Sequence, residues 1–122
     1  MINFFMSVNS AQDLLEKKEI NGEELEYLIK ERKENRVSFL LIDVREEYEF
    51  NEKHILGVDY LLPLSDFFNQ VKRIEKDKSR YIIAKCKLGG RSARAQMYLR
   101  QMGFKNVINL AGGIINYKGA TT

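Results

Sequence analysis

The chain has 122 residues, with 44% hydrophobic and 30% charged side chains and a net charge of +3, which indicates one globular domain with a single core. Its one cysteine excludes an internal disulfide framework, and a lone cysteine beside a lone histidine argues against a zinc site. No apolar run approaches the roughly 18 residues of a membrane span and no basic segment marks a signal peptide, so we expect a protein of the reducing cytoplasm without metal, cofactor or membrane partner.

Capping residues, apolar runs and helical stripes divide the chain into alternating helices and strands. Asn21 and Glu24 have the spacing of a capping box, and the continuous apolar run 39–42 is typical of a strand that is buried on both faces. In the short polar helix that follows, we expect Tyr48 or Phe50 to turn inward. In chain order, the predicted elements are a helix over about residues 10–19, a short strand from 20, a helix over 21–33, a strand over 39–42, a helix over 46–51, a strand over 58–62, a helix over 65–74, a strand over 81–84, a helix over 92–102 and a strand over 107–110, with residues 1–9 unassigned.

This alternation predicts an α/β fold. Strands that alternate with helices imply βαβ crossovers and a mainly parallel sheet with helices on both faces. The helical spacing of Phe67 and Phe68 places both in the core. Ligands bind at the carboxyl ends of the strands in such sheets. Asp43 and Cys86 each follow a predicted strand at that edge, so we expect the functional site there.

The loop after the strand over 81–84 has the composition of an anion-holding reaction centre. It contains the only cysteine, Cys86, and two glycines, Gly89 and Gly90, that allow successive backbone N–H groups to point inward as a nest. A helix N-terminus near Ser92 and nearby cations would lower the pKa of the thiol, whose nucleophilic form is the thiolate. The cations near the cysteine in sequence are Lys85, Lys87, Arg91 and Arg94.

Charge is distributed unevenly along the chain. Residues 80–122 contain eight basic residues and no acidic one, whereas residues 1–79 carry a net charge of −5. A positive field in the second half would attract a small anion to the loop. The alternative is that basic side chains only coat solvent-exposed faces, which we favour for Arg100, Lys105 and Lys118. No basic run or interleaved aromatic platform indicates nucleic acid as a partner.

Four short motifs follow one another along the chain. The loop 86–92 reads Cys-x-x-Gly-x-Arg-Ser, residues 43–45 read Asp-x-Arg, and residues 110–114 contain a closing Gly-Gly pair. The fourth motif consists of Glu49, Phe50, His54, Ile55 and Gly57. In this order and spacing the motifs resemble those of the single-domain rhodaneses, members of the thiosulfate:cyanide sulfurtransferase superfamily. Residues 20–122 would then form the rhodanese-like domain, and residues 1–19 an N-terminal helical extension for oligomer contact or partner docking.

The resemblance implies a five-stranded parallel sheet and a ping-pong transfer of sulfur. Cys86 would attack the outer sulfur of a small anionic donor such as thiosulfate, release sulfite, and pass the sulfur from its persulfide to cyanide, a thiol or a sulfur-relay protein. Asp43 and Arg45 would support the loop without touching the substrate. The residues that would bind the donor are Lys87, Leu88, Gly89, Gly90, Arg91 and Ser92.

Individual positions leave alternatives open. Arg91 contacts the donor anion or pairs with a carboxylate such as Asp43 or Glu49. Lys87 lies either at the rim of the site or on the solvated surface. We expect His54 to be structural and hydrogen-bonded within its turn. The chain departs from the family at three positions, where the family usually has Gly, Pro and Trp: Lys53, Leu56 and Tyr117.

Three other functions compete with a thiosulfate enzyme. Related phosphatases of this fold use Cys-x₅-Arg, whereas four residues separate Cys86 from Arg91, and the shorter loop suits one sulfur atom better than a phosphate. A persulfide carrier fed by a partner protein in a thiolation pathway would use identical loop chemistry. A non-catalytic binding module is disfavoured because Cys86 is present.

Overall fold

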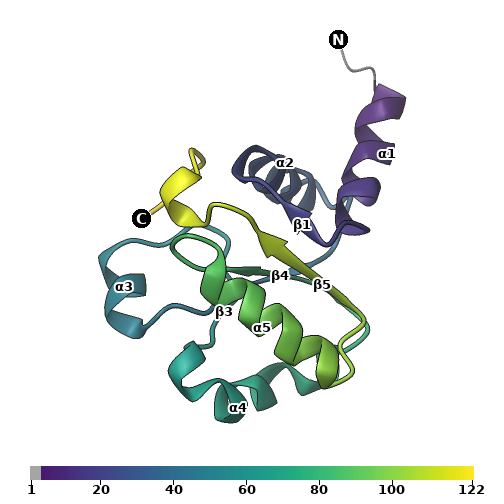
Figure 1. Ribbon diagram of the computed structural model, residues 1–122. Helices are drawn as coiled ribbons and strands as arrows, with labels where there is room; N and C mark the ends of the chain where they lie inside the picture. The colour runs from purple at the N-terminus through teal and green to yellow at the C-terminus, as the bar shows by residue number, and fades with distance from the viewer. Residues whose placement is uncertain (1–3) are drawn as a thin grey trace.

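Five parallel strands form the centre of the computed structural model, which describes the backbone of residues 4–122 and the side chains from residue 10 on (Figure 1). The strands lie in the order β1-β5-β4-β2-β3, and each neighbouring pair is parallel. The predicted α/β fold with a five-stranded parallel sheet is therefore confirmed. The strands are β1 Glu19–Ile20, β2 Leu40–Asp43, β3 Tyr60–Leu61, β4 Tyr81–Lys85 and β5 Asn106–Leu110.

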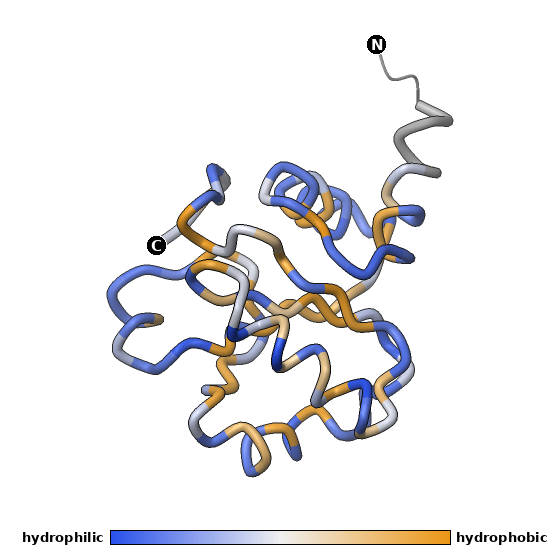
Figure 2. Tube along the Cα trace, in the orientation of Figure 1, coloured by the Kyte–Doolittle hydropathy of each residue, from blue (hydrophilic) through white to orange (hydrophobic). Residues whose placement is uncertain are grey.

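Helices cover both faces of this sheet and create two core layers. On one face, α1 (Phe4–Leu15) and α2 (Gly22–Lys33) pack on alternate strand residues; on the other, α4 (Phe67–Gln70) and α5 (Gly90–Gln101) do so. Figure 2 shows the hydrophobic segments concentrated along the central strands, with hydrophilic stretches outside. The remaining helical elements are α3 (Glu47–Glu52) and three 3₁₀ helices, Leu64–Asp66, Val71–Asp77 and Ile114–Asn116. None of the helices in the described part of the chain is both long and apolar enough to cross a membrane.

The second helix forms as predicted, because its signals are local. The side chain of Asn21 accepts a hydrogen bond from the backbone N–H of Glu24 at 2.9 Å, and the carboxylate of Glu24 accepts one from the backbone of Asn21 at 2.9 Å. This reciprocal capping box satisfies two N–H groups that have no partner within the helix. Leu25 and Leu28 then bury the inner face of α2 completely.

The first helix differs from the prediction. It begins at Phe4 rather than near residue 10, so Ser10 lies in its interior and not at an N-cap. It also ends at Leu15, four residues earlier than expected. The physical reason is packing: Ala11 and Leu15 are buried against the sheet, and the chain must then turn to lay β1 beside β5.

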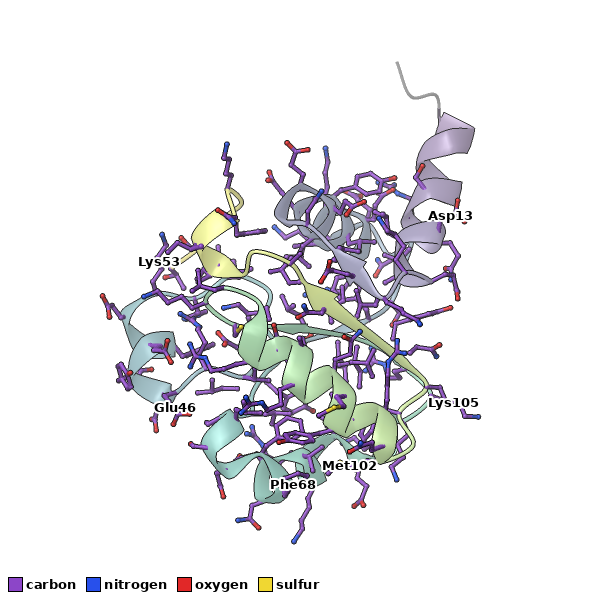
Figure 3. The ribbon with its side chains drawn as sticks, in the orientation of Figure 1. Asp13, Glu46, Lys53, Phe68, Met102 and Lys105 are labelled. Carbon is purple, nitrogen blue, oxygen red and sulfur yellow. The ribbon has the colours of Figure 1, made fainter. Side chains whose placement is uncertain are left out.

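The helix expected over 65–74 is broken into three short pieces. Two 3₁₀ segments flank the single α-helical turn of α4, and Ile74 has non-helical backbone angles (φ −117°, ψ 15°). Phe67 is buried in the core as expected, whereas Phe68 is 57% exposed and lies over α4 at the rim of the molecule (Figure 3). The predicted core position of Phe68 is therefore wrong. Tyr48 in α3 is 72% exposed, so Phe50 is the residue that turns inward.

Candidate active site at Cys86

The short loop between β4 and α5 lies at the carboxyl edge of the sheet (Figure 1), and Cys86 is its first residue. Its side chain is only 1% exposed and packs in the core layer below α5. Gly89, the residue before the helix, has a φ of 108°, a left-handed conformation that costs glycine little. This turn brings the N–H groups at the start of α5 towards the sulfur atom.

Hydrogen-bond donors surround the sulfur atom. The backbone N–H groups of Gly89 and Ser92 lie 3.0 and 3.4 Å from Sγ, and the hydroxyl oxygen of Ser92 lies at 3.3 Å. Burial raises the pKa of the Cys86 thiol, but hydrogen bonds from Ser92, Gly89 and Leu88 outweigh it, so the pKa lies below its ordinary value. A lowered pKa is what the helix N-terminus predicts, and the hydrogen bonds, rather than the nearby cations, are the main causes of it.

The Gly-Gly segment after β5 fixes the backbone of the loop. The N–H of Ile114 donates to the carbonyl of Cys86 at 2.9 Å, and the N–H of Ile115 donates to the carbonyl of Lys87 at 3.2 Å. Gly113 has a φ of 57°, and a Cβ atom there would lie 2.3 Å from the carbonyl oxygen of Lys87. Residues 112–115, which we call the strap, therefore hold the loop, and only glycine fits at position 113.

Arg91 is held by Glu49 of α3. The two side chains form a bidentate pair with N–O distances of 2.7 and 2.9 Å. The hydrogen bond from Arg91 is the main cause that lowers the pKa of Glu49 to about 2. The carboxylate partner considered for Arg91 in the sequence is therefore present, and it is Glu49 rather than Asp43. A contact between Arg91 and a donor anion stays a prediction.

The family follows from comparison with known proteins. A family model, described as the rhodanese-like domain, matches residues 24–120. This chain belongs to the rhodanese-like domain family. The rhodanese-like domain of the Anabaena sp. Alr3790 protein has a TM-score of 0.72 at 25% identity, covering 87% of this chain and 79% of its own. A rhodanese with anions from E. coli has a TM-score of 0.61 at 25% identity, and the match covers 70% of this chain and 98% of that structure.

Curated relatives of this rhodanese-like domain include longer proteins. The Bacillus subtilis protein named "Putative sulfur carrier protein YrkF" is 33% identical over 92 residues, which are 75% of this chain and 48% of the relative. The tRNA uridine(34) hydroxylase of Sodalis glossinidius is 34% identical over 84 residues, 64% of this chain and 23% of the enzyme. The chain thus spans about half of the first relative and under a quarter of the second.

The rhodanese-like domain has a cleft of about 390 Å³ beside the loop. It lies between α3 and the strap, and Lys87, which is exposed, forms part of its wall. Glu46 and Lys53 mark the two ends of α3 next to this region in Figure 3. Leu88 is 65% exposed at the tip of the loop, whereas Ser92 is fully buried. The cleft borders the loop at Lys87. Its lining residues are Arg45, Tyr48, Glu49, Glu52, Lys53, Lys87, Ile114, Ile115 and Tyr117.

Asp43, Arg45 and Lys85 form a buried charged cluster. The carboxylate of Asp43 accepts hydrogen bonds from Arg45 Nη2 at 2.8 Å and from Lys85 Nζ at 2.9 Å, and Arg45 Nη2 also donates to the carbonyl of Lys53 at 2.7 Å. Burial lowers the pKa of Lys85 to about 8. Lys85 is one of the cations named near Cys86 in the sequence, and its charge interacts with the thiol, but alternation along β4 points its side chain to the opposite face, where it pairs with Asp43.

Sequence reasoning misses Asn109, which lies in β5 and is 4% exposed. Its Oδ1 atom accepts a hydrogen bond from the hydroxyl of Ser92 at 2.6 Å. A polar residue that interrupts the apolar strand just before the Gly-Gly pair is the signal that could have found it.

His54 is hydrogen-bonded within its turn, as expected. Its Nδ1 atom lies 3.0 Å from the carbonyl oxygen of Phe50, and the rings of the two residues stack with their centroids 3.8 Å apart.

Proposed function

We propose that this domain transfers sulfane sulfur through a persulfide on Cys86. The observation that carries the proposal is the ring of donors around Sγ, which stabilises a negative charge on or next to that atom. The buried thiolate is a nucleophile that needs no general base. A persulfide cycle through one free thiol fits a reducing compartment such as the cytoplasm, where thiol acceptors are abundant.

The reaction has two displacement steps. In the first, the Cys86 thiolate attacks the outer sulfur of thiosulfate or a similar anion; the S–S bond of the donor breaks and sulfite leaves with the electron pair. In the second, cyanide or a thiolate attacks the outer sulfur of the persulfide and the Cys86 thiolate is regenerated. Since the chain has one cysteine, a small molecule or a partner protein must be the acceptor.

Charge at the loop supports an anionic donor. Lys87 is exposed at the cleft, and Arg91 keeps a side chain that is 36% exposed although Glu49 holds it. We propose that Lys87 attracts the donor and that Arg91 orients it through the N–H groups that face away from Glu49. A phosphatase is disfavoured by the length of the loop, because only four residues separate Cys86 from Arg91.

A persulfide carrier is the second candidate, and the likeness to YrkF favours it. In that role a partner protein delivers the sulfur and another receives it, and the 390 Å³ cleft beside the loop offers room for an extended segment of such a partner. The dependence of the loading rate on thiosulfate concentration discriminates the two. A thiosulfate enzyme saturates near or below about millimolar donor, within the usual KM range of enzymes, whereas a carrier does not.

Intact mass spectrometry after thiosulfate treatment tests the proposal. We expect the protein to gain the mass of one sulfur atom, and cyanide to remove it. Cys86→Ser should gain nothing. The matched control is Cys86→Ser combined with Ser79→Cys, which carries an ordinary thiol at an exposed turn outside the loop. Loading of this control at the wild-type rate, or no loading of the wild type, would contradict a loop-dependent persulfide.

A further inference from the structure

The hydroxyl of Ser92 lies within hydrogen-bond distance of three possible acceptors but can donate to one of them at a time. Its oxygen lies 2.6 Å from Asn109 Oδ1, 3.2 Å from the carbonyl oxygen of Gly89 and 3.3 Å from Cys86 Sγ. A hydroxyl donates only one proton. Because Ser92 is fully buried, no solvent competes for that proton. The direction of this O–H bond therefore decides whether the sulfur atom faces the proton or the lone pairs of the Ser92 oxygen.

The surroundings of Asn109 fix its amide. Its Nδ2 atom lies 3.3 Å from the carbonyl oxygen of Gly89 and 3.3 Å from a carboxylate oxygen of Glu19, and both of these oxygens are acceptors. Rotating the amide by half a turn would set Oδ1 against two other oxygen atoms. Oδ1 must therefore face Ser92, and its 2.6 Å contact is the shortest one that the hydroxyl makes.

When Ser92 donates to Asn109, its lone pairs face the sulfur atom. A neutral thiol fits that arrangement, since its S–H can donate to Ser92 Oγ at 3.3 Å. A thiolate does not fit it, because two electron-rich atoms would then face each other. The hydroxyl has to turn from Asn109 to Sγ when the sulfur atom becomes charged.

We infer that Asn109 is a positioning residue of the sulfur-transfer cycle and acts on Cys86 through the hydroxyl of Ser92. While Sγ is neutral, Ser92 donates to Asn109; when the thiol proton has left to water, the O–H bond rotates to the thiolate. In the persulfide the negative charge lies on the outer sulfur, so the hydroxyl returns to Asn109. It turns to Sγ again when the acceptor displaces the thiolate. This inference rests on the proposed function.

Asn109 therefore competes with the thiolate for one proton. Removing its acceptor oxygen leaves the carbonyl of Gly89 as the remaining neutral competitor, and a charged sulfur atom is the stronger acceptor of the two, so Ser92 should donate more readily to the thiolate. Other charged groups near the thiol come from three elements: Lys85 of β4, Arg91 of α5 and Glu19 of β1, which approaches only through Asn109. Glu19 loses its hydrogen bond to Asn109 in the variant, so the comparison with the Ser92→Ala background is needed to isolate the part of the shift that passes through the hydroxyl.

The experiment measures the pH dependence of Cys86 alkylation by iodoacetamide in the folded protein. In Asn109→Leu we expect the midpoint to move to lower pH by about half to one unit, the size of one competing hydrogen bond. In a Ser92→Ala background the same substitution should produce no shift, as a double-mutant cycle requires. Asn109→Asp keeps the size of the side chain, accepts more strongly from Ser92 and adds a negative charge that repels the thiolate, so its midpoint should move to higher pH for both reasons.

Asn106→Leu is the matched control, because Asn106 lies at the other end of β5 and its side chain donates a hydrogen bond to the carbonyl of Ser79 near that end. It should leave the midpoint unchanged. A purely structural role of Asn109 would loosen Gly89 and move the midpoint of Asn109→Leu to higher pH whether or not Ser92 is present. That result, or no shift at all, would overturn the inference. Alkylation needs no sulfur donor, so failure of wild-type loading by thiosulfate would count against the proposed function alone.

Discussion

Glu49 connects α3 to the first turn of α5 through its bidentate pair with Arg91. Its pKa is lowered from 4.5 to about 2, chiefly by the hydrogen bond from Arg91. A depressed pKa stabilises the fold above the ordinary value, and this stabilisation disappears as the pH falls through the folded value. We therefore expect Glu49→Gln to lower the free energy of unfolding by about 1 kcal/mol at pH 7, a figure reduced because Arg91 is partly exposed. Urea unfolding at several pH values measures it.

The pH dependence separates the ion pair from a general effect of the substitution. The difference between wild type and Glu49→Gln should shrink between pH 4.5 and about 2, where the wild-type carboxyl also becomes neutral. Glu52→Gln, an exposed change near the end of the same helix, should show no such convergence. A difference that stays constant down to pH 2 would mean that the charge of Glu49 does not stabilise the fold.

At the residue scale, the sequence names the reacting group but not all of its partners. The spacing of Cys86 and Arg91 is local and can be recognised directly. The partner of Arg91 lies 42 residues away, and no local pattern chooses Glu49 over Asp43. The sequence does not identify Asn109 as a partner of the site, because one polar residue in a short strand is equally compatible with a solvent-facing position. The alternation of β4 could have placed Lys85 correctly, since neighbouring strand residues point to opposite faces.

At the element scale, the strap after β5 makes the geometry of the loop depend on Gly113. A Cβ atom there would lie 2.3 Å from the Lys87 carbonyl oxygen and 2.5 Å from that of Cys86. Gly113→Ala must displace one of the two segments, and misplaced reacting groups lower rates on the order of 10- to 100-fold. We expect that loss in the rate of persulfide formation from thiosulfate, followed by mass spectrometry.

Gly90→Ala is the matched control, because a Cβ atom on Gly90 meets nothing within 4 Å and the residue already has helical geometry. Its loading rate should remain within about twofold of wild type, and alanine's helix propensity should slightly stabilise α5. If Gly113→Ala loaded as fast as Gly90→Ala, the strap would not be needed to position the loop.

Elements with local signals are predicted better than elements shaped by packing. The capping box of α2 involves Asn21 and Glu24, three residues apart, and its start is predicted correctly. The bounds of α1 depend instead on where Ala11 and Leu15 contact the sheet. The short helical pieces over residues 64–77 form because Phe67, Val71 and Ile74 all pack into one core layer. The regular spacing of an α-helix does not predict where these pieces begin and end.

At the scale of the whole molecule, continuous apolar runs predict the parallel sheet but do not determine its strand order. The first strand, Glu19–Ile20, pairs with the last, at Asn109 and Leu110. A two-residue strand carries no pattern that selects a partner so far along the chain. The order β1-β5-β4-β2-β3 comes from the packing of helices on both faces. This order also places Glu19 beside Asn109, and so beside the site.

The positive field of residues 80–122 is weaker than their eight basic residues suggest. Lys85 is buried and shares Asp43 with Arg45, Arg91 pairs with Glu49, and Arg80 lies 3.8 Å from Asp77. Lys87 is the exposed cation next to Cys86 in the loop. We therefore expect the rate of loading by dianionic thiosulfate to fall only about two- to threefold as the Debye length shortens from about 30 to about 8 Å with added salt. Alkylation by neutral iodoacetamide should not change.

Substitution of Lys87 shows where the field arises. Lys87→Gln should slow thiosulfate loading at low salt and remove most of its salt dependence, while Lys118→Gln, an exposed change farther along the chain, should alter neither. A fall of more than about tenfold with salt that persists in Lys87→Gln would instead assign the attraction to the summed charge of the basic half. Because screening acts on encounter and not on a buried thiolate, the salt response separates delivery of the anion from the reactivity of Cys86.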